Sequence, residues 1–115
     1  MTNSRMRKVN ELLREVLSEA VLALKDPRIG FVTVTGVRTS PDLSHARVYV
    51  SVFGSERKRE QSLAGLEAAH GVLQARIASE VRMKRTPTLT FEYDPTVEEG
   101  VRMSKLIDEL APRDE

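Results

Sequence analysis

A glycine stands in the middle of a long helical pattern. Apolar residues at helical spacing flank Gly71 on both sides, with Leu66 before it and Leu73 after it. A glycine in a helix interior costs about 1 kcal/mol relative to alanine, so Gly71 indicates a break, a kink or a close approach by another backbone. We therefore predict two helices joined at an elbow formed by Ala69, His70 and Gly71. Small side chains that let the two helices pack closely would explain both Ala69 and Gly71.

A long amphipathic helix is predicted ahead of this region. Apolar residues from Val9 to Leu24 recur at i, i+3, i+4 and i+7, and Pro27 ends the pattern. Two strands follow, over 31–38 and 46–53, because both segments are rich in β-branched residues and the second alternates cleanly. The turn residues between them predict an antiparallel hairpin. Gly36 is the expected position of a β-bulge, which would restore the register of the first strand.

The second half of the chain continues this mixed pattern. Ser55 is the expected cap of a helix that runs to the elbow and resumes to about Met83. A third strand is predicted over 88–93, and a final helix over 97–110 starts at a capping box of Thr96 and Glu99. We expect one α+β domain over 1–110, in which a three-stranded sheet has its helices packed on one face, and a short frayed tail over 111–115.

The charge of the chain is unevenly distributed. The net charge is only +1, but residues 1–91 hold 15 Lys and Arg against 9 Asp and Glu, which gives +6. Residues 92–115 hold 3 against 8, which gives −5. A basic body with an acidic C-terminal segment suggests a polyanion as the partner of the body. The alternative is that these charges are solvated helix faces.

The residue types present argue against several classes of protein. There is no cysteine, so thiol nucleophiles, thiolate metal sites and disulfides are excluded. The chain lacks a P-loop and an H-E-x-x-H motif, and His45 with His70 is too small a set for a metal site. No enzymatic activity, cofactor or metal is therefore expected. No apolar run approaches membrane-spanning length, so we expect a soluble, cytoplasmic protein.

Several motifs in one order resemble bacterial ribosome-binding factor A. They are Lys25-Asp26-Pro27-Arg28-Ile29-Gly30, Val32-Thr33-Val34-Thr35, Ser40-Pro41-Asp42-Leu43, Ala46-Arg47-Val48-Tyr49-Val50-Ser51, Leu66-Glu67-Ala68-Ala69-His70-Gly71, Arg85-Thr86-Pro87-Thr88-Leu89-Thr90-Phe91 with Asp94, and Gly100-Val101-Arg102-Met103. The resemblance covers roughly residues 5–110. It implies a KH-like fold of the second topological type (α-β-β-α-kink-α-β plus a C-terminal helix), in which an Ala-x-Gly kink replaces the Gly-x-x-Gly loop.

The same resemblance implies a function in ribosome assembly. The implied role is binding of the free small (30S) ribosomal subunit and its 16S rRNA, near the 5′-end helix and the decoding-side neck, during late maturation of the rRNA 5′ end. It further implies a link to growth in the cold and release by a ribosome-assembly GTPase. We expect a monomer.

Clustered cations supply the candidate RNA-binding residues. We expect recognition of rRNA shape and phosphates rather than of a four-nucleotide sequence, because the Ala-x-Gly elbow has less bare backbone than a Gly-x-x-Gly loop. The candidates are Arg5, Arg7, Lys8, Arg57, Lys58, Arg59, His70, Gly71, Arg76, Arg82, Lys84 and Arg85. An exposed linker histidine is the simpler interpretation of His70, and most of the five aromatic residues are interpreted as core or hairpin packing. A protein adaptor that docks through its acidic C-terminal helix, without touching RNA, is the rival hypothesis.

Overall fold

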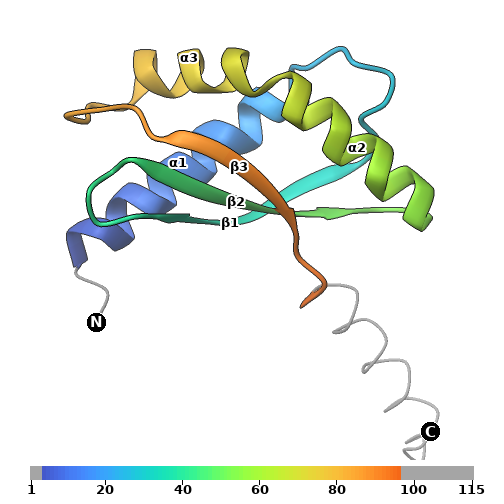
Figure 1. The fold of residues 1–115 in the computed structure, drawn as a ribbon, viewed down its shortest axis with the longest axis horizontal. Coiled ribbons are helices and arrows are strands. Elements are labelled where there is room, and N and C mark those ends of the chain that lie inside the picture. The colour runs from blue at the N-terminus through green and yellow to red at the C-terminus, as the bar shows by residue number, and fades with distance from the viewer. Residues whose placement is uncertain (1–3, 97–115) are drawn as a thin grey trace, which may run out of the picture.

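The computed structural model describes residues 4–96, which form three helices and three strands (Figure 1). In chain order these are α1 (Ser4–Leu22), β1 (Val32–Thr39), β2 (His45–Val52), α2 (Glu56–Ala68), α3 (His70–Glu80) and β3 (Thr88–Tyr93). The α+β class, the element order and the extent of β3 agree with the sequence prediction. The predicted final helix over 97–110, the Glu99 side of its capping box and the tail over 111–115 lie outside the described residues.

The strands form one mixed sheet in the order β1-β2-β3. β1 and β2 are an antiparallel hairpin, whereas β2 and β3 run parallel because α2 and α3 carry the chain back across the sheet. The register of β1 shifts between Val34 and Gly36, so Thr35 is the extra residue of a bulge. The predicted bulge at Gly36 is therefore confirmed, and it is what brings Val37 to the same face as Val34, where both are buried.

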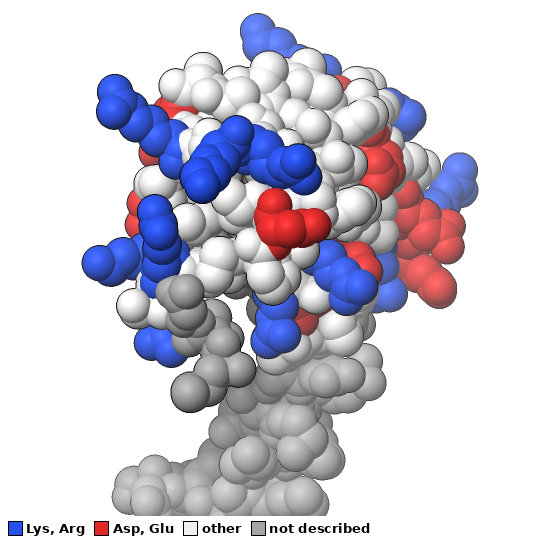
Figure 2. Space-filling model, turned by 60° about the vertical axis from the view of Figure 1, so that its left-hand side comes forward, with Lys and Arg blue, Asp and Glu red and all other residues white. Residues whose placement is uncertain are grey.

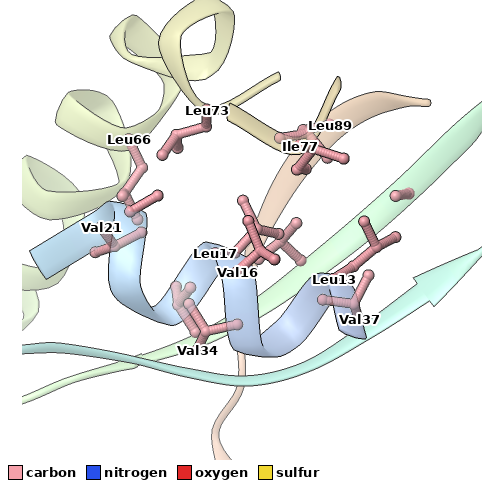
Figure 3. Close-up of a cluster of buried hydrophobic side chains, with 14 of the residues drawn as sticks. Leu13, Val16, Leu17, Val21, Val34, Val37, Leu66, Leu73, Ile77 and Leu89 are labelled. Atoms are coloured by element: carbon pink, nitrogen blue, oxygen red, sulfur yellow. The ribbon is translucent and has the colours of Figure 1, made fainter. Parts of the chain in front are cut away.

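All three helices pack on one face of this sheet. Ala46, Val48, Val50 and Val52 alternate along β2 and are all buried on that face. They meet apolar side chains from every helix, among them Leu13, Leu17, Leu66, Leu73 and Ile77 (Figure 3). The opposite face, which we call the open face, carries the intervening residues of β2 and remains partly exposed. The single-layer helix packing expected from the alternation is thus confirmed.

The interruption between α2 and α3 is a single residue. Ala69 has φ −92° and ψ 4°, and its backbone N–H still donates to Gly65 O and Leu66 O, so the chain bends without losing its hydrogen bonds. Gly71 lies within the first turn of α3 and is exposed. A Cβ atom at this position would meet no other atom within 4 Å. The close helix packing expected at Gly71 is therefore wrong, because the space beside it is open.

The close approach occurs one helix earlier, at Gly65. A Cβ atom there would lie 2.6 Å from Ile29 Cγ1, because the loop between α1 and β1 crosses α2 at this point. Ser62, one turn before, is fully buried and accepts a hydrogen bond from the Gly30 N–H at 3.1 Å. Together these small residues fix the loop over 23–31 against α2.

Two helix boundaries differ from the prediction. α1 ends at Leu22 rather than near Leu24, and α3 ends at Glu80 rather than near Met83. Val81 adopts an extended backbone, with φ −119° and ψ 124°, and its side chain is buried in the core. The apolar pattern therefore continues past the last helical turn, although the helix itself does not. Among the described residues, no helix combines the length and the apolar character needed to cross a membrane.

Candidate nucleic-acid interface

Three segments that are far apart in the sequence meet at one end of the molecule. They are the N-terminal turns of α1, the β1–β2 loop and the segment between α3 and β3, all at the left-hand end in Figure 1. A groove runs between them and is lined by Arg5, Pro41, Leu43, Arg82 and Lys84, among others. We call this end, with its cations Arg5, Arg7, Lys8, Arg82, Lys84 and Arg85, the basic end. Six of the predicted binding residues are thus brought together by the fold.

The cations of the basic end are exposed to solvent. Figure 2 brings this end forward and shows Lys and Arg side chains over much of it, with acidic atoms between them and toward the right. Within residues 4–96, the structure has no ion pair for Arg7, Lys8, Arg82 or Lys84. These four exposed cations repel one another, and an external anion would stabilise them.

The β1–β2 loop at this end is held in place by Asp42. Its Oδ1 atom accepts from the hydroxyls of Ser40 and Ser44, both at 2.7 Å, and from the Ser44 N–H at 3.1 Å. These hydrogen bonds hold the pKa of Asp42 well below its usual range, and the charge of Arg85 lowers it further. Asp42 is therefore an ionised carboxylate at neutral pH, and its hydrogen bonds hold the loop in shape.

A second hollow lies between α1 and β1 and adjoins the basic end. Arg7, Arg14 and Arg38 line it. Asn10 and Thr39 also line it, and the Asn10 Oδ1 atom accepts a hydrogen bond from the Thr39 N–H at 3.0 Å. Arg14 is paired with Glu11 on its own helix. Arg38 is a cation that the sequence prediction missed, because its contribution to this surface depends on the hairpin lying beside α1.

The three cations at the start of α2 lie elsewhere. α2 begins at the right-hand end in Figure 1, across the molecule from the basic end. The aliphatic stem of Lys58 packs beside Gly30 and Gly54, and the Arg59 guanidinium lies 3.8 Å from the centroid of the Tyr93 ring. Arg57 is exposed. The fold therefore separates Arg57, Lys58 and Arg59 from the other predicted binding cations.

The residues of the elbow region form a third position, on top of the molecule. The exposed His70 ring Nδ1 lies 2.8 Å from the Glu67 carbonyl oxygen, which ties the side chain to the end of α2. Arg76 forms an ion pair with Glu80 one turn further along α3. The candidate cations thus divide over three places, and only the basic end combines several of them around a groove.

Two of the five aromatic residues are exceptions to the packing role expected of most of them. Phe31 and Phe53 have exposed fractions of 84% and 83%. Both occupy positions just outside the strands on the open face, which none of α1, α2 and α3 covers. Phe91, in contrast, is partly buried against the core, as expected. Among the described residues there is also no group of three or more His, Cys, Asp or Glu that could hold a metal ion.

Comparison with known proteins places this arrangement in a family. Residues 5–107 match the family described as ribosome-binding factor A. Ribosome-binding factor A of Halothermothrix orenii is 40% identical over 116 residues, which cover 100% of this chain and 95% of that protein.

Solved structures agree with the sequence comparison. The crystal structure of ribosome-binding factor A from Thermus thermophilus superposes with a TM-score of 0.70 at 39% identity, over 76% of this chain and 93% of that one. A Thermus thermophilus homology model fitted into a cryo-EM map of a 30S–RbfA complex gives a TM-score of 0.63 at 40% identity, over 75% of this chain and 91% of that one. This chain therefore belongs to the ribosome-binding factor A family.

Proposed function

We propose that this protein binds the small ribosomal subunit and that the basic end is its principal contact with 16S rRNA. The observation that carries the proposal is the convergence of exposed cations from two separate segments, the start of α1 and the segment after α3, around one groove. Family membership supports the choice of partner, since a Thermus thermophilus relative has been fitted into a map of a 30S complex. The protein acts as an assembly factor without catalysis of its own.

The chemistry of the basic end favours recognition of phosphates in folded RNA. Lys and Arg side chains that approach phosphates position a protein without reading sequence, which suits a factor that has one folded target. The two segments that carry these cations are anchored on one core through Leu13 and Val81, so their backbones keep a fixed spacing. Shape is then read by whether the phosphates of the target match that spacing.

In the cell, this binding would assist late maturation of the subunit. We infer a role in processing of the 16S rRNA 5′ end, importance for growth in the cold, and release promoted by a ribosome-assembly GTPase. The factor would act in the cytoplasm as a monomer. A KH-like type II domain with an Ala-x-Gly kink is the corresponding interpretation of the fold, and the element order α-β-β-α-α-β supports it.

Charge reversal at the basic end tests the proposal. Binding of the purified protein to isolated 30S subunits is measured over a series of salt concentrations. Reversal of Arg82, Lys84 and Arg85 to glutamate should weaken binding, and the slope of log K against log salt should become shallower by about one for each phosphate contact removed.

A single pair of substitutions provides the matched control. Lys84→Glu at the groove and Lys25→Glu beyond the far end of α1 change the charge equally, and both side chains are exposed. We expect Lys84→Glu to weaken binding and Lys25→Glu to have a much smaller effect. Equal effects of the two, or an unchanged affinity and slope in the triple variant, would exclude the basic end from the interface.

A further inference from the structure

Two phenylalanines form a pair on the open face of the sheet. The Phe53 N–H donates to the Phe31 carbonyl oxygen at 3.0 Å, which continues the β1–β2 register one step past the pair of Val32 and Val52. Val52 is buried on the helix side, so its neighbour Phe53 lies on the open face, and Phe31 lies opposite it. Side chains directly opposite in an antiparallel pair have Cβ atoms about 5 Å apart. Two aromatic rings are therefore presented side by side.

The exposure of both rings is unusual for residues of this size. Each ring is more than four-fifths exposed, whereas aromatic side chains normally dominate the buried area of cores and interfaces. Neither ring is needed to fill the core, which Val32, Val34, Val50 and Val52 complete at this end of the hairpin. Both rings are therefore available for contact with a ligand.

The stem of Lys58 packs next to the backbone that carries the pair. Lys58 extends its stem across Gly30 and Gly54, the residues that immediately precede Phe31 and follow Phe53. A Cβ atom on Gly30 would lie 2.5 Å from Lys58 Cε, so the side chain occupies the space that the glycine leaves free. Glu56 and Glu60 each lie two residues from Lys58 in the sequence, and the exposed Arg57 lies between Glu56 and Lys58.

The surroundings of the pair distinguish between two kinds of ligand. The residues next to the rings on the open face are polar, Thr33 on β1 and Ser51 on β2, so the apolar surface is limited to two flat rings. Protein docking sites usually have a contiguous apolar patch of several hundred Å². Binding of single-stranded nucleic acid instead uses separate aromatic rings for stacking, next to cations that neutralise the backbone.

We propose that Phe31 and Phe53 are a stacking platform for unpaired bases of an RNA strand, with Lys58 on an adjoining phosphate. The platform lies at the opposite end of the molecule from the basic end and constitutes a second contact. This inference rests on the proposed function, because an rRNA partner would present both a phosphate backbone and unpaired bases.

Substitutions of the two rings separate stacking from simple apolar contact. The double variant Phe31→Leu/Phe53→Leu keeps apolar side chains but removes the flat π faces, whereas Phe31→Tyr/Phe53→Tyr keeps the π faces. Phe31→Ala/Phe53→Ala removes both. The control is Leu22→Ala on α1, which truncates an apolar side chain that is 80% exposed. The probes are an eight-nucleotide oligoadenylate and isolated 30S subunits.

Stacking makes a distinctive prediction for these variants. The Ala and Leu variants should each lose roughly tenfold in affinity for both probes at every salt concentration, with an unchanged salt slope, because stacking releases few counterions. The Tyr and Leu22→Ala variants should bind like the unsubstituted protein. Lys58→Met, which keeps the stem, should make the salt slope shallower by about one.

The other outcomes overturn the inference. Normal binding of oligoadenylate by every variant, with weaker 30S binding by the Ala variant alone, would assign the pair to an apolar contact with a protein. Normal binding of both probes by all variants would leave the rings without a role in RNA binding. In each of these cases the unsubstituted protein still binds 30S subunits, whereas failure of the proposed function would abolish that binding in the unsubstituted protein itself.

Discussion

Replacement of either helical glycine by alanine tests the geometry of the α2–α3 region, and the two variants should act in opposite directions. Both glycines lie in helices, where glycine is less favourable than alanine by about 0.5–1 kcal/mol. At Gly71 the added methyl group would meet open space. Gly71→Ala should therefore raise the free energy of unfolding by about 0.5–1 kcal/mol, because only the conformational gain remains.

At Gly65 the same gain is outweighed by a clash. The new Cβ atom would lie 2.6 Å from Ile29 Cγ1, 3.2 Å from Ile29 Cδ1 and 3.4 Å from Asp26 Oδ2. The loop cannot move away freely, because the Ile29 N–H donates to the Asp26 carbonyl oxygen and Ser62 holds Gly30. Insertion of a methyl group into such a contact costs about 1–3 kcal/mol. After the helix gain is subtracted, Gly65→Ala should lower the free energy of unfolding by about 1–2 kcal/mol.

Urea unfolding followed by far-UV circular dichroism measures both variants, and the unsubstituted protein is the reference. In a domain of this size, 1 kcal/mol corresponds to a shift of the melting temperature by roughly 4–8 °C, so thermal unfolding provides a second reading. If Gly71→Ala destabilised the protein as much as Gly65→Ala does, the open space beside Gly71 and the bend at Ala69 would both be refuted. Unchanged stability in Gly65→Ala would show that the loop over 23–31 is not fixed against α2.

Two further predictions concern buried polar contacts and acid. Ser62→Ala should lower the free energy of unfolding by about 1–3 kcal/mol, because the part-buried Gly30 N–H would lose its acceptor. Urea unfolding measures this change, and an unaltered urea midpoint would contradict the prediction. The pKa of Asp42 is lowered chiefly by the Ser40 hydroxyl, and that of Asp94 chiefly by the side chain of Thr96 and then by the Thr35 hydroxyl. Lowered carboxyl pKa values stabilise the native state above the unfolded pKa of about 3.9, and this stabilisation is lost as the pH falls toward the native values. The free energy of unfolding should therefore decrease below about pH 4. This decrease should be less steep in the double variant Asp42→Asn/Asp94→Asn, and urea unfolding over a series of pH values measures the difference.

Local patterns were sufficient to predict most of the fold. The alternation of β2, the apolar stripe of α1 and the Ser55 cap all depend on residues close together in the sequence, and the structure confirms each of them. The bulge was predictable because Val37 falls out of step with Val34, which only an extra residue can correct. The end of α3 was not predictable in this way, since Val81 continues the apolar pattern while its backbone leaves the helix.

The candidate site was harder to predict from the sequence, because the positions of cations in the sequence do not show which of them lie close together in the fold. Arg57 is at the start of α2 and Arg82 follows α3, and Figure 1 shows the start of α2 and the end of α3 at opposite ends of the molecule. Arg5 and Lys84 lie far apart in the sequence and line one groove. The exposure of Phe53 had a signal, since the alternation that buries Val52 assigns its neighbour to the open face. The prediction instead followed the general tendency of aromatic residues to be buried.

The bulge in β1 also bears on the behaviour of the protein at high concentration. β1 lies at one edge of the sheet, and an exposed edge strand is a template for pairing with another chain. The extra residue Thr35 interrupts the regular row of backbone donors and acceptors, and its hydroxyl is occupied with Tyr49 O and Asp94 Oδ2. A second copy of the strand cannot pair in register along the whole length of such an edge. The same irregularity that aligns the core therefore hinders edge-to-edge pairing along the β1 edge of the sheet.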